Sequence, residues 1–159
     1  MSRICCFTGH RDIRTSEYLK AITALENELA RLVDEEGVTD FRAGGARGFD
    51  TMAALSVLKL KMTHPEIKLH LILPCKDQDK YFATAEKSIY KYILESADSV
   101  SYVRERYSSG VMAVRNRALV DGADVCLAYL TRLSGGTYQT VGMARRSGVQ
   151  VINVYKKLI

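Results

Sequence analysis

The 159-residue sequence lacks a long apolar run, a low-complexity tract and more than two prolines. Its longest purely apolar stretch, residues 125–130, is six residues long, far short of the roughly 20 that span a bilayer. The apolar stretch near the N-terminus is too short for a signal peptide, so we expect a cytoplasmic protein with no membrane partner. With 47% hydrophobic and 26% charged residues, the composition excludes disordered, collagenous and coiled-coil chains.

Metal-ligand spacing is also absent among the cysteines and histidines. These residues are Cys5, Cys6, Cys75, Cys126, His10, His64 and His70. The cysteines are expected to be small buried apolar residues in a reducing compartment. The sequence therefore predicts no metal site and no required cofactor. It leaves undecided whether a nucleotide-like ligand binds.

Positive charge is concentrated in the last part of the chain. The net charge is +5, made up of −1 over residues 1–100 and +6 over residues 101–159. Most of the surplus is arginine, whose planar fork suits phosphate or carboxylate better than lysine does. This favours an anionic partner, either a phosphate-bearing small molecule or nucleic acid; the alternative is a solvated basic face.

Short β-rich runs alternate with amphipathic stretches along the sequence. Strands are predicted at residues 4–8, 38–43, 67–73, 99–103, 124–130 and 149–155. Helices are predicted from Thr15 or Ser16, either of which can cap the start, to Gly37, and then at residues 50–61, 82–93, 111–120 and 137–147. The alternation predicts one α/β domain over residues 1–159: a three-layer, doubly wound, mostly parallel sheet of about six strands with helices on both faces.

Seven of the eleven glycines fall at turns that lead from a strand into a helix. They are Gly9, Gly44, Gly45, Gly48, Gly110, Gly135 and Gly136. At that edge of a parallel sheet, backbone N–H groups converge and each following helix offers the positive end of its dipole. The positions of these glycines predict a site for an anionic ligand.

Three glycine-containing segments carry the candidate site. Residues 8–11 (TGHR) suit a phosphate or a ribose, unless the histidine and arginine are merely exposed loop residues. Residues 44–50 (GGARGFD) match neither the G-x-G-x-x-G fingerprint nor a P-loop, but they could cradle a phosphate. Within them Asp50 could bind a ribose hydroxyl, cap the helix, or do both. Residues 134–140 (SGGTYQT) open a helix directly after the most strand-like run.

A fourth segment, Arg115-Asn116, lies on a predicted helix. The two side chains point about 100° apart there, so both could reach the site only near the helix start; the alternative is a surface helix. The candidate ligand-binding residues are Thr8, Gly9, His10, Arg11, Gly44, Gly45, Arg47, Gly48, Asp50, Pro74, Arg115, Asn116, Ser134, Gly135, Gly136, Thr137 and Thr140.

In this order and spacing, the segments TGHR, GGARGFD, RNR (residues 115–117) and SGGT with Thr140 resemble the SLOG superfamily. That superfamily joins the DNA-processing protein DprA with the LOG proteins, and the resemblance is strongest to its YpsA/YoqJ-like branch. It implies a Rossmann-like sheet that binds nucleotides or their derivatives through the glycine-rich turns. It also implies a ligand sensor rather than an enzyme, and a homodimer.

One position departs from the LOG pattern. LOG-type phosphoribohydrolases carry a glutamate that works on the N-glycosidic bond, and the alignment places Thr140 there. The leading hypothesis is therefore a non-catalytic nucleotide-binding domain with no catalytic residue. One alternative is a hydrolase of nucleoside monophosphates in which Asp50 or Asp77 replaces the glutamate. The other is a DprA-like single-stranded DNA binder, for which Tyr102, Tyr107 and Tyr138 are the nearby aromatic candidates.

Overall fold

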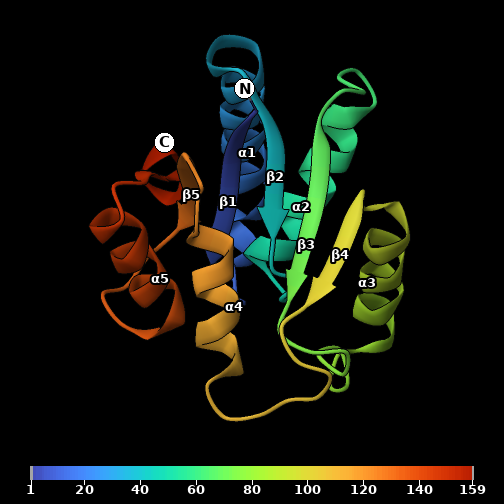
Figure 1. Ribbon diagram of the computed structural model, residues 1–159. Coiled ribbons are helices and arrows are strands. Elements are labelled where there is room, and N and C mark those ends of the chain that lie inside the picture. Colours follow the sequence, from blue (N-terminus) through green and yellow to red (C-terminus); the bar gives the residue numbers. More distant parts are fainter. Residues whose placement is uncertain (1, 159) are drawn as a thin grey trace.

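Residues 2–158, which the structure describes, form a six-stranded sheet with helices on both faces (Figure 1). The structure is a computed structural model. The strands are β1 (Arg3–Gly9), β2 (Val38–Ala43), β3 (Lys68–Leu73), β4 (Ser99–Tyr102), β5 (Val125–Tyr129) and β6 (Gln150–Asn153). The helices are α1 (Thr15–Glu36), α2 (Phe49–Lys61), α3 (Thr84–Ser96), α4 (Val111–Val120), α5 (Gly135–Arg146) and the 3-10 helix η1 (Val154–Lys157).

The first strand of the chain, β1, lies in the middle of the sheet. Its strand order is β4-β3-β2-β1-β5-β6, and all neighbouring pairs within residues 2–158 are parallel. The chain builds outwards from β1 through β4 and then crosses back to place β5 on the other side of β1. The strand order therefore reverses between β1 and β5, where doubly wound sheets bind ligands at the carboxyl ends of the strands. The predicted fold class is confirmed.

Helices α1, α2 and α3 pack on one face, and α4 and α5 pack on the other. In Figure 1, α4 stands in front of the sheet and α1 lies behind it. All five residues of β5 are buried because helices cover both faces of the sheet there. All four residues of β4, at the edge of the sheet, are exposed. On the α1–α3 face, the core includes the stacked rings of Phe7 and Phe41, whose centroids lie 6.0 Å apart.

A smaller core lies between the sheet and helices α4 and α5. Its buried members are Cys6, Leu119, Val120, Cys126, Ala144 and Val149. Within residues 2–158, all four cysteines are buried and free, as the sequence predicted. Strands β1 and β5 thus contribute buried residues to both cores, and this packing on both faces positions their carboxyl ends.

The start of α1 differs from the prediction. The helix begins at Thr15 and its N-cap is Arg14, which makes no side-chain capping bond in the described part of the chain. The expectation that Thr15 or Ser16 caps this helix is therefore wrong. The other end is confirmed: Gly37 has φ +69°, and its N–H donates to the carbonyl of Leu32.

Three later elements also differ from the prediction. Helix α3 runs from Thr84 to Ser96 instead of over residues 82–93. Helix α5 begins at Gly135, two residues before the predicted start. Strand β6 ends at Asn153 instead of residue 155, because the Oδ1 atom of Asn153 accepts from the backbone N–H of Tyr155 at 3.2 Å and turns the chain into η1. Among residues 2–158, each helix is too short or too polar to cross a membrane.

Candidate ligand-binding site

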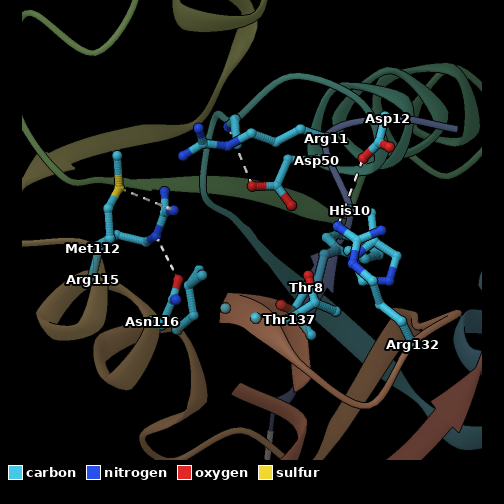
Figure 2. A pocket seen from close by; sticks show the side chains of 16 residues that line it. Thr8, His10, Arg11, Asp12, Asp50, Met112, Arg115, Asn116, Arg132 and Thr137 are labelled. Carbon is cyan, nitrogen blue, oxygen red and sulfur yellow. Dashed lines mark hydrogen bonds and ion pairs between the residues drawn. The ribbon is translucent and has the colours of Figure 1, made fainter. Parts of the chain in front are cut away.

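A cleft of about 280 Å³ opens at the carboxyl ends of β1 and β5, where the strand order reverses. It is built from four segments: the end of β1 with the following loop, the β2–α2 turn, one side of α4, and the start of α5 with the preceding loop. The lining residues are Phe7, Thr8, Gly9, His10, Arg11, Asp12, Ala46, Asp50, Met112, Arg115, Asn116, Leu119, Arg132, Gly135, Gly136 and Thr137. Figure 2 shows these side chains around the cleft.

Ten of the seventeen predicted site residues line this cleft. They are Thr8, Gly9, His10, Arg11, Asp50, Arg115, Asn116, Gly135, Gly136 and Thr137. The other seven do not line it: Gly44, Gly45, Arg47, Gly48, Pro74, Ser134 and Thr140. Segments that are distant in sequence thus meet at one edge of the sheet. The role of each residue in binding a ligand stays a prediction.

Arg115 is the buried cation of the cleft. Its residue is only 5% exposed, so the alternative of a plain surface helix is wrong at this position. The Nη1 atom donates to the carbonyl of Gly44, Nε donates to Oδ1 of Asn116 at 2.8 Å, and Nη2 approaches the sulfur of Met112 at 3.7 Å. Burial lowers the pKa of Arg115 from its ordinary value, and the Asp50 charge opposes this. The contacts with Gly44, Asn116 and Met112 set the orientation of the guanidinium.

Asp50 is the buried carboxyl of the cleft. It is 5% exposed, and its Oδ2 atom accepts the backbone N–H of Ala46 at 3.2 Å. Burial raises its pKa, while the positive charges of Arg115 and Arg11 oppose the rise. The N-cap of α2 is Gly48, so the predicted capping role of Asp50 is wrong. Asp50 instead braces its own loop and faces the Arg115 charge.

His10 joins the ends of two strands. Its Nε2 atom accepts the backbone N–H of Thr131, just after β5, at 3.0 Å, which leaves the ring proton on Nδ1. Burial lowers the pKa of His10, the Arg132 charge lowers it further, and Asp12 opposes them. At 5% exposure, His10 is a buried neutral imidazole, so the alternative of an exposed loop residue is wrong for it. Arg11 is exposed.

The start of α5 leaves open space. Apart from the adjoining residues and the helix's own backbone, no heavy atom of residues 2–158 lies within 4 Å of a Cβ built at Gly135 or Gly136. The N-cap Ser134 makes no capping bond with its side chain in this part of the chain. Thr140 is buried, and its hydroxyl donates to the carbonyl of Gly136 in the same helix at 2.8 Å. The first N–H groups of α5 are therefore open to a ligand.

The glycines of the other two segments make room for the protein itself. A Cβ at Gly9 would lie 2.4 Å from Cβ of Phe49, and one at Gly48, where φ is +76°, would lie 2.3 Å from the carbonyl oxygen of Arg11. A Cβ at Gly44 would lie 2.6 Å from Nη1 of Arg115 and 3.0 Å from Oδ2 of Asp50. These glycines let the β2–α2 turn pack against β1 and Arg115.

Sequence reasoning missed six residues that line the cleft: Phe7, Asp12, Ala46, Met112, Leu119 and Arg132. The Nη2 atom of Arg132 lies 3.9 Å from Oδ1 of Asp12, so this pair bridges the loops after β5 and β1 (Figure 2). Asp12 lies four residues after the predicted strand at 4–8, and Arg132 lies two residues after the one at 124–130, so their place in the loops after these strands was the available signal. With Arg11 and Arg115, the cleft holds three guanidiniums against two carboxylates.

Comparison with known proteins places the chain in a family. The family model YpsA, described as the YspA SLOG family, matches residues 5–145. The chain belongs to this SLOG family. The resemblance drawn from the glycine-containing segments is thereby confirmed, and the match spans every segment of the cleft.

Individual relatives agree with this assignment. A UPF0398 protein of Halalkalibacterium halodurans is 37% identical over 118 residues, which cover 73% of this chain and 59% of that protein. The chain thus spans about three fifths of that relative. The prophage-derived protein YoqJ of Bacillus subtilis is 29% identical over 131 residues, covering 75% of this chain and 77% of YoqJ.

The fold is also similar to solved structures. DNA processing protein A from Helicobacter pylori, described with its single-stranded DNA binding mode, aligns with a TM-score of 0.66 and 21% identity. The alignment covers 94% of this chain and 63% of that protein. At this identity, the likeness supports the Rossmann-like SLOG fold.

Proposed function

We propose that this SLOG domain binds a nucleotide or nucleotide derivative without chemical turnover and holds its phosphate in the cleft beside Arg115. The observation that carries the proposal is the guanidinium of Arg115, buried in the wall and oriented by Gly44 and Asn116. Three of its five N–H donors have partners within the described residues. The remaining two are free to donate to a phosphate oxygen.

The start of α5 supplies the second half of the proposed phosphate site. Uncapped N–H groups and the positive end of the helix dipole favour an anion there. The open space at Gly135 and Gly136 lets a phosphate approach the main chain. A ligand anion would also offset the desolvation of the buried guanidinium, since a buried charge is costly without a partner.

The absence of turnover is proposed from the composition of α5. Its sequence, GGTYQTVGMARR, contains no carboxylate, and the Thr140 hydroxyl is engaged with Gly136. The sensor role, the homodimer and the cytoplasmic location implied by the sequence stay predictions. Sedimentation velocity at micromolar protein concentrations tests the dimer.

Thermal unfolding with a ligand panel tests the proposed function. The panel contains nucleoside mono- and diphosphates, ADP-ribose, dinucleotides and inorganic phosphate, with matching nucleosides as phosphate-free controls. A ligand at 100 times its Kd stabilises by about 2.7 kcal/mol, which raises Tm by several degrees in a domain of this size. Failure of all phosphate-bearing compounds to raise Tm contradicts the proposal.

A second candidate function is binding of single-stranded DNA. It is favoured by the fold likeness to DNA processing protein A and by the net charge of +6 over residues 101–159. Fluorescence anisotropy with a labelled oligothymidylate tests it. Affinity resting on phosphate contacts should fall steeply as salt rises from 50 to 200 mM. No binding at 50 mM salt, or affinity independent of salt, excludes this function.

A further inference from the structure

A second cavity, of about 310 Å³, lies beside the cleft at the carboxyl ends of β1 and β5. The two cavities share three lining residues, Arg11, Ala46 and Met112. The other residues that line the second cavity are Arg47, Cys75, Asp77, Gln78, Lys80, Tyr81, Phe82 and Tyr107. A ligand whose phosphate lies in the first cleft could therefore extend directly into the second.

Aromatic rings from separate segments surround this second cavity. Tyr81 and Phe82 precede α3, and Tyr107 lies in the segment that joins β4 to α4, which runs beneath the carboxyl ends of the strands in Figure 1. Tyr81 is 83% exposed and Tyr107 is 64% exposed. Single exposed aromatics are common on proteins, but two beside one cavity offer flat surfaces on which a planar ring can stack.

The remaining parts of this cavity are held in place. The ring of Phe82 packs edge-on against Tyr90 at 5.5 Å, and the guanidinium of Arg47 lies 5.5 Å from the Phe82 ring centroid. The carboxylate of Asp77 accepts the backbone N–H of Tyr107 at 3.2 Å, which ties the two aromatic segments together. The stacking surfaces are therefore carried on anchored backbone.

One side chain links the two cavities. The Nε2 atom of Gln78 donates to the carbonyl of Gly44 at 3.3 Å, and Arg115 donates to the same carbonyl oxygen. The Oε1 atom of Gln78 accepts from the hydroxyl of Tyr90 at 3.2 Å, which sets the orientation of the amide. One N–H of the amide is left to meet a polar ring edge. Flat rings with polar edges are typical of nucleobases.

We propose that the second cavity, lined by Tyr81, Phe82, Tyr107 and Gln78, is a nucleobase subsite. It takes the base of the nucleotide whose phosphate lies beside Arg115. The inference rests on the proposed function and extends it, because it assigns the rest of the ligand. The same chemistry serves a free nucleotide or one unit of a single strand, and separate probes distinguish these two sources.

Isothermal titration with two kinds of probe tests the subsite. The base-bearing probes are AMP, GMP, CMP and UMP, and the base-free probe is ribose 5-phosphate. At least one monophosphate should bind at least fivefold more tightly than ribose 5-phosphate, since stacking contributes about fivefold to a hundredfold per base. Equal affinities overturn the subsite but leave the phosphate site standing. Failure of ribose 5-phosphate and all four nucleotides to bind contradicts both.

Matched tyrosine variants locate the effect. Tyr81→Ala and Tyr107→Ala should each weaken nucleotide binding by about fivefold to a hundredfold and leave ribose 5-phosphate binding unchanged. Tyr92→Ala is the control, because Tyr92 is 55% exposed on α3 and lies outside both cavities. Nucleotide affinity unchanged in both variants, or equal losses for both kinds of probe, overturns the proposal.

A fluorescent variant gives a second readout. The chain contains no tryptophan, so Tyr81→Trp introduces a single reporter and keeps a stacking surface. Its emission should be quenched by the bound nucleotide but not by ribose 5-phosphate. Quenching by an oligothymidylate alone would identify a strand unit as the source of the base. Emission that no base-bearing probe changes contradicts the subsite.

Discussion

Arg115 on α4 donates from Nη1 to the carbonyl oxygen of Gly44, which lies 71 residues earlier, directly after β2. This bond ties a helix on one face of the sheet to the turn that starts a helix on the other face. Gly44 has no side chain, so Arg115 and Asp50 can both approach its backbone. The buried guanidinium of Arg115 thus stabilises the cleft through hydrogen bonds to other residues of the protein.

Removal of that cation should destabilise the fold. Arg115→Met removes the buried positive charge that faces Asp50 and one of the two donors to the Gly44 carbonyl, the other being Gln78. We expect the free energy of unfolding to fall by about 3 kcal/mol. Urea unfolding followed by circular dichroism measures this. Arg117→Met is the control, because Arg117 is exposed on the same helix and should change stability by less than about 0.5 kcal/mol. Equal effects of the two variants would show that Arg115 has no special structural role.

The same pair can be measured by a double-mutant cycle. If Arg115 and Asp50 interact, Asp50→Asn combined with Arg115→Met should cost less stability than the sum of the two single changes. Additive effects contradict a direct electrostatic interaction between them.

The glycines should separate into two classes on substitution. Gly9→Ala places a Cβ 2.4 Å from Cβ of Phe49, and overpacking of this kind costs about 1–3 kcal/mol. Gly136→Ala meets open space at a helical position whose φ is not left-handed, and should raise the free energy of unfolding by about 0.5 kcal/mol. Thermal and urea unfolding of both variants check this. A loss of stability at Gly136 comparable to that at Gly9 would contradict the open space at the start of α5.

His10 should make stability depend on pH. Its pKa in the folded protein lies below the ordinary value of 6.5, so the unfolded chain binds the proton more readily. The contribution of His10 is fully present above about pH 7. It is lost as the pH falls from 6.5 towards the lowered pKa, because a protonated Nε2 can no longer accept from Thr131.

Comparison with His10→Gln isolates this effect, because a Gln oxygen can accept the same bond without titrating. The difference in unfolding free energy, wild type minus variant, should rise between pH 5 and 7 and then level off. A difference that is flat, or that falls over this range, contradicts the neutral buried histidine.

Incubation with nucleoside monophosphates should release no free base. The basis is the uncharged Thr140 on α5, whose hydroxyl already donates to Gly136. Liquid chromatography of overnight reactions with purified protein measures this. Release of base by the wild type but not by Asp50→Asn would establish a hydrolase that uses the buried carboxyl.

Local sequence signals were sufficient for most of the fold. Alternating patterns located the strands and helices, and Gly37, Gly122 and Gly148 marked three helix ends, each with a positive φ. The errors came where tertiary contacts decide a boundary. Strand β6 ends early because Asn153 bonds to Leu130 and Tyr155, and α1 starts without the side-chain cap that its sequence offered.

The candidate site was harder to predict for the same reason. The sequence located the turns, but it does not distinguish a glycine that makes room for a ligand from one that makes room for another part of the protein. Phe49 fills the space at Gly9, whereas Gly136 faces open space. The burial of Arg115 likewise depends on a carbonyl 71 residues away, which no local pattern reveals.

The most direct test of phosphate binding is titration of the tightest-binding nucleotide of the panel into the wild type, Gly136→Asp and Gly136→Asn. A carboxylate at Gly136 repels an anion but suits the start of a helix, so Gly136→Asp should bind at least tenfold more weakly and unfold at the same or a higher Tm. Gly136→Asn adds a side chain of the same size without the charge, so any loss caused by filling the open space is shared by both variants, and Gly136→Asp should still bind more weakly than Gly136→Asn. Wild-type affinity in Gly136→Asp would contradict a phosphate held at the start of α5.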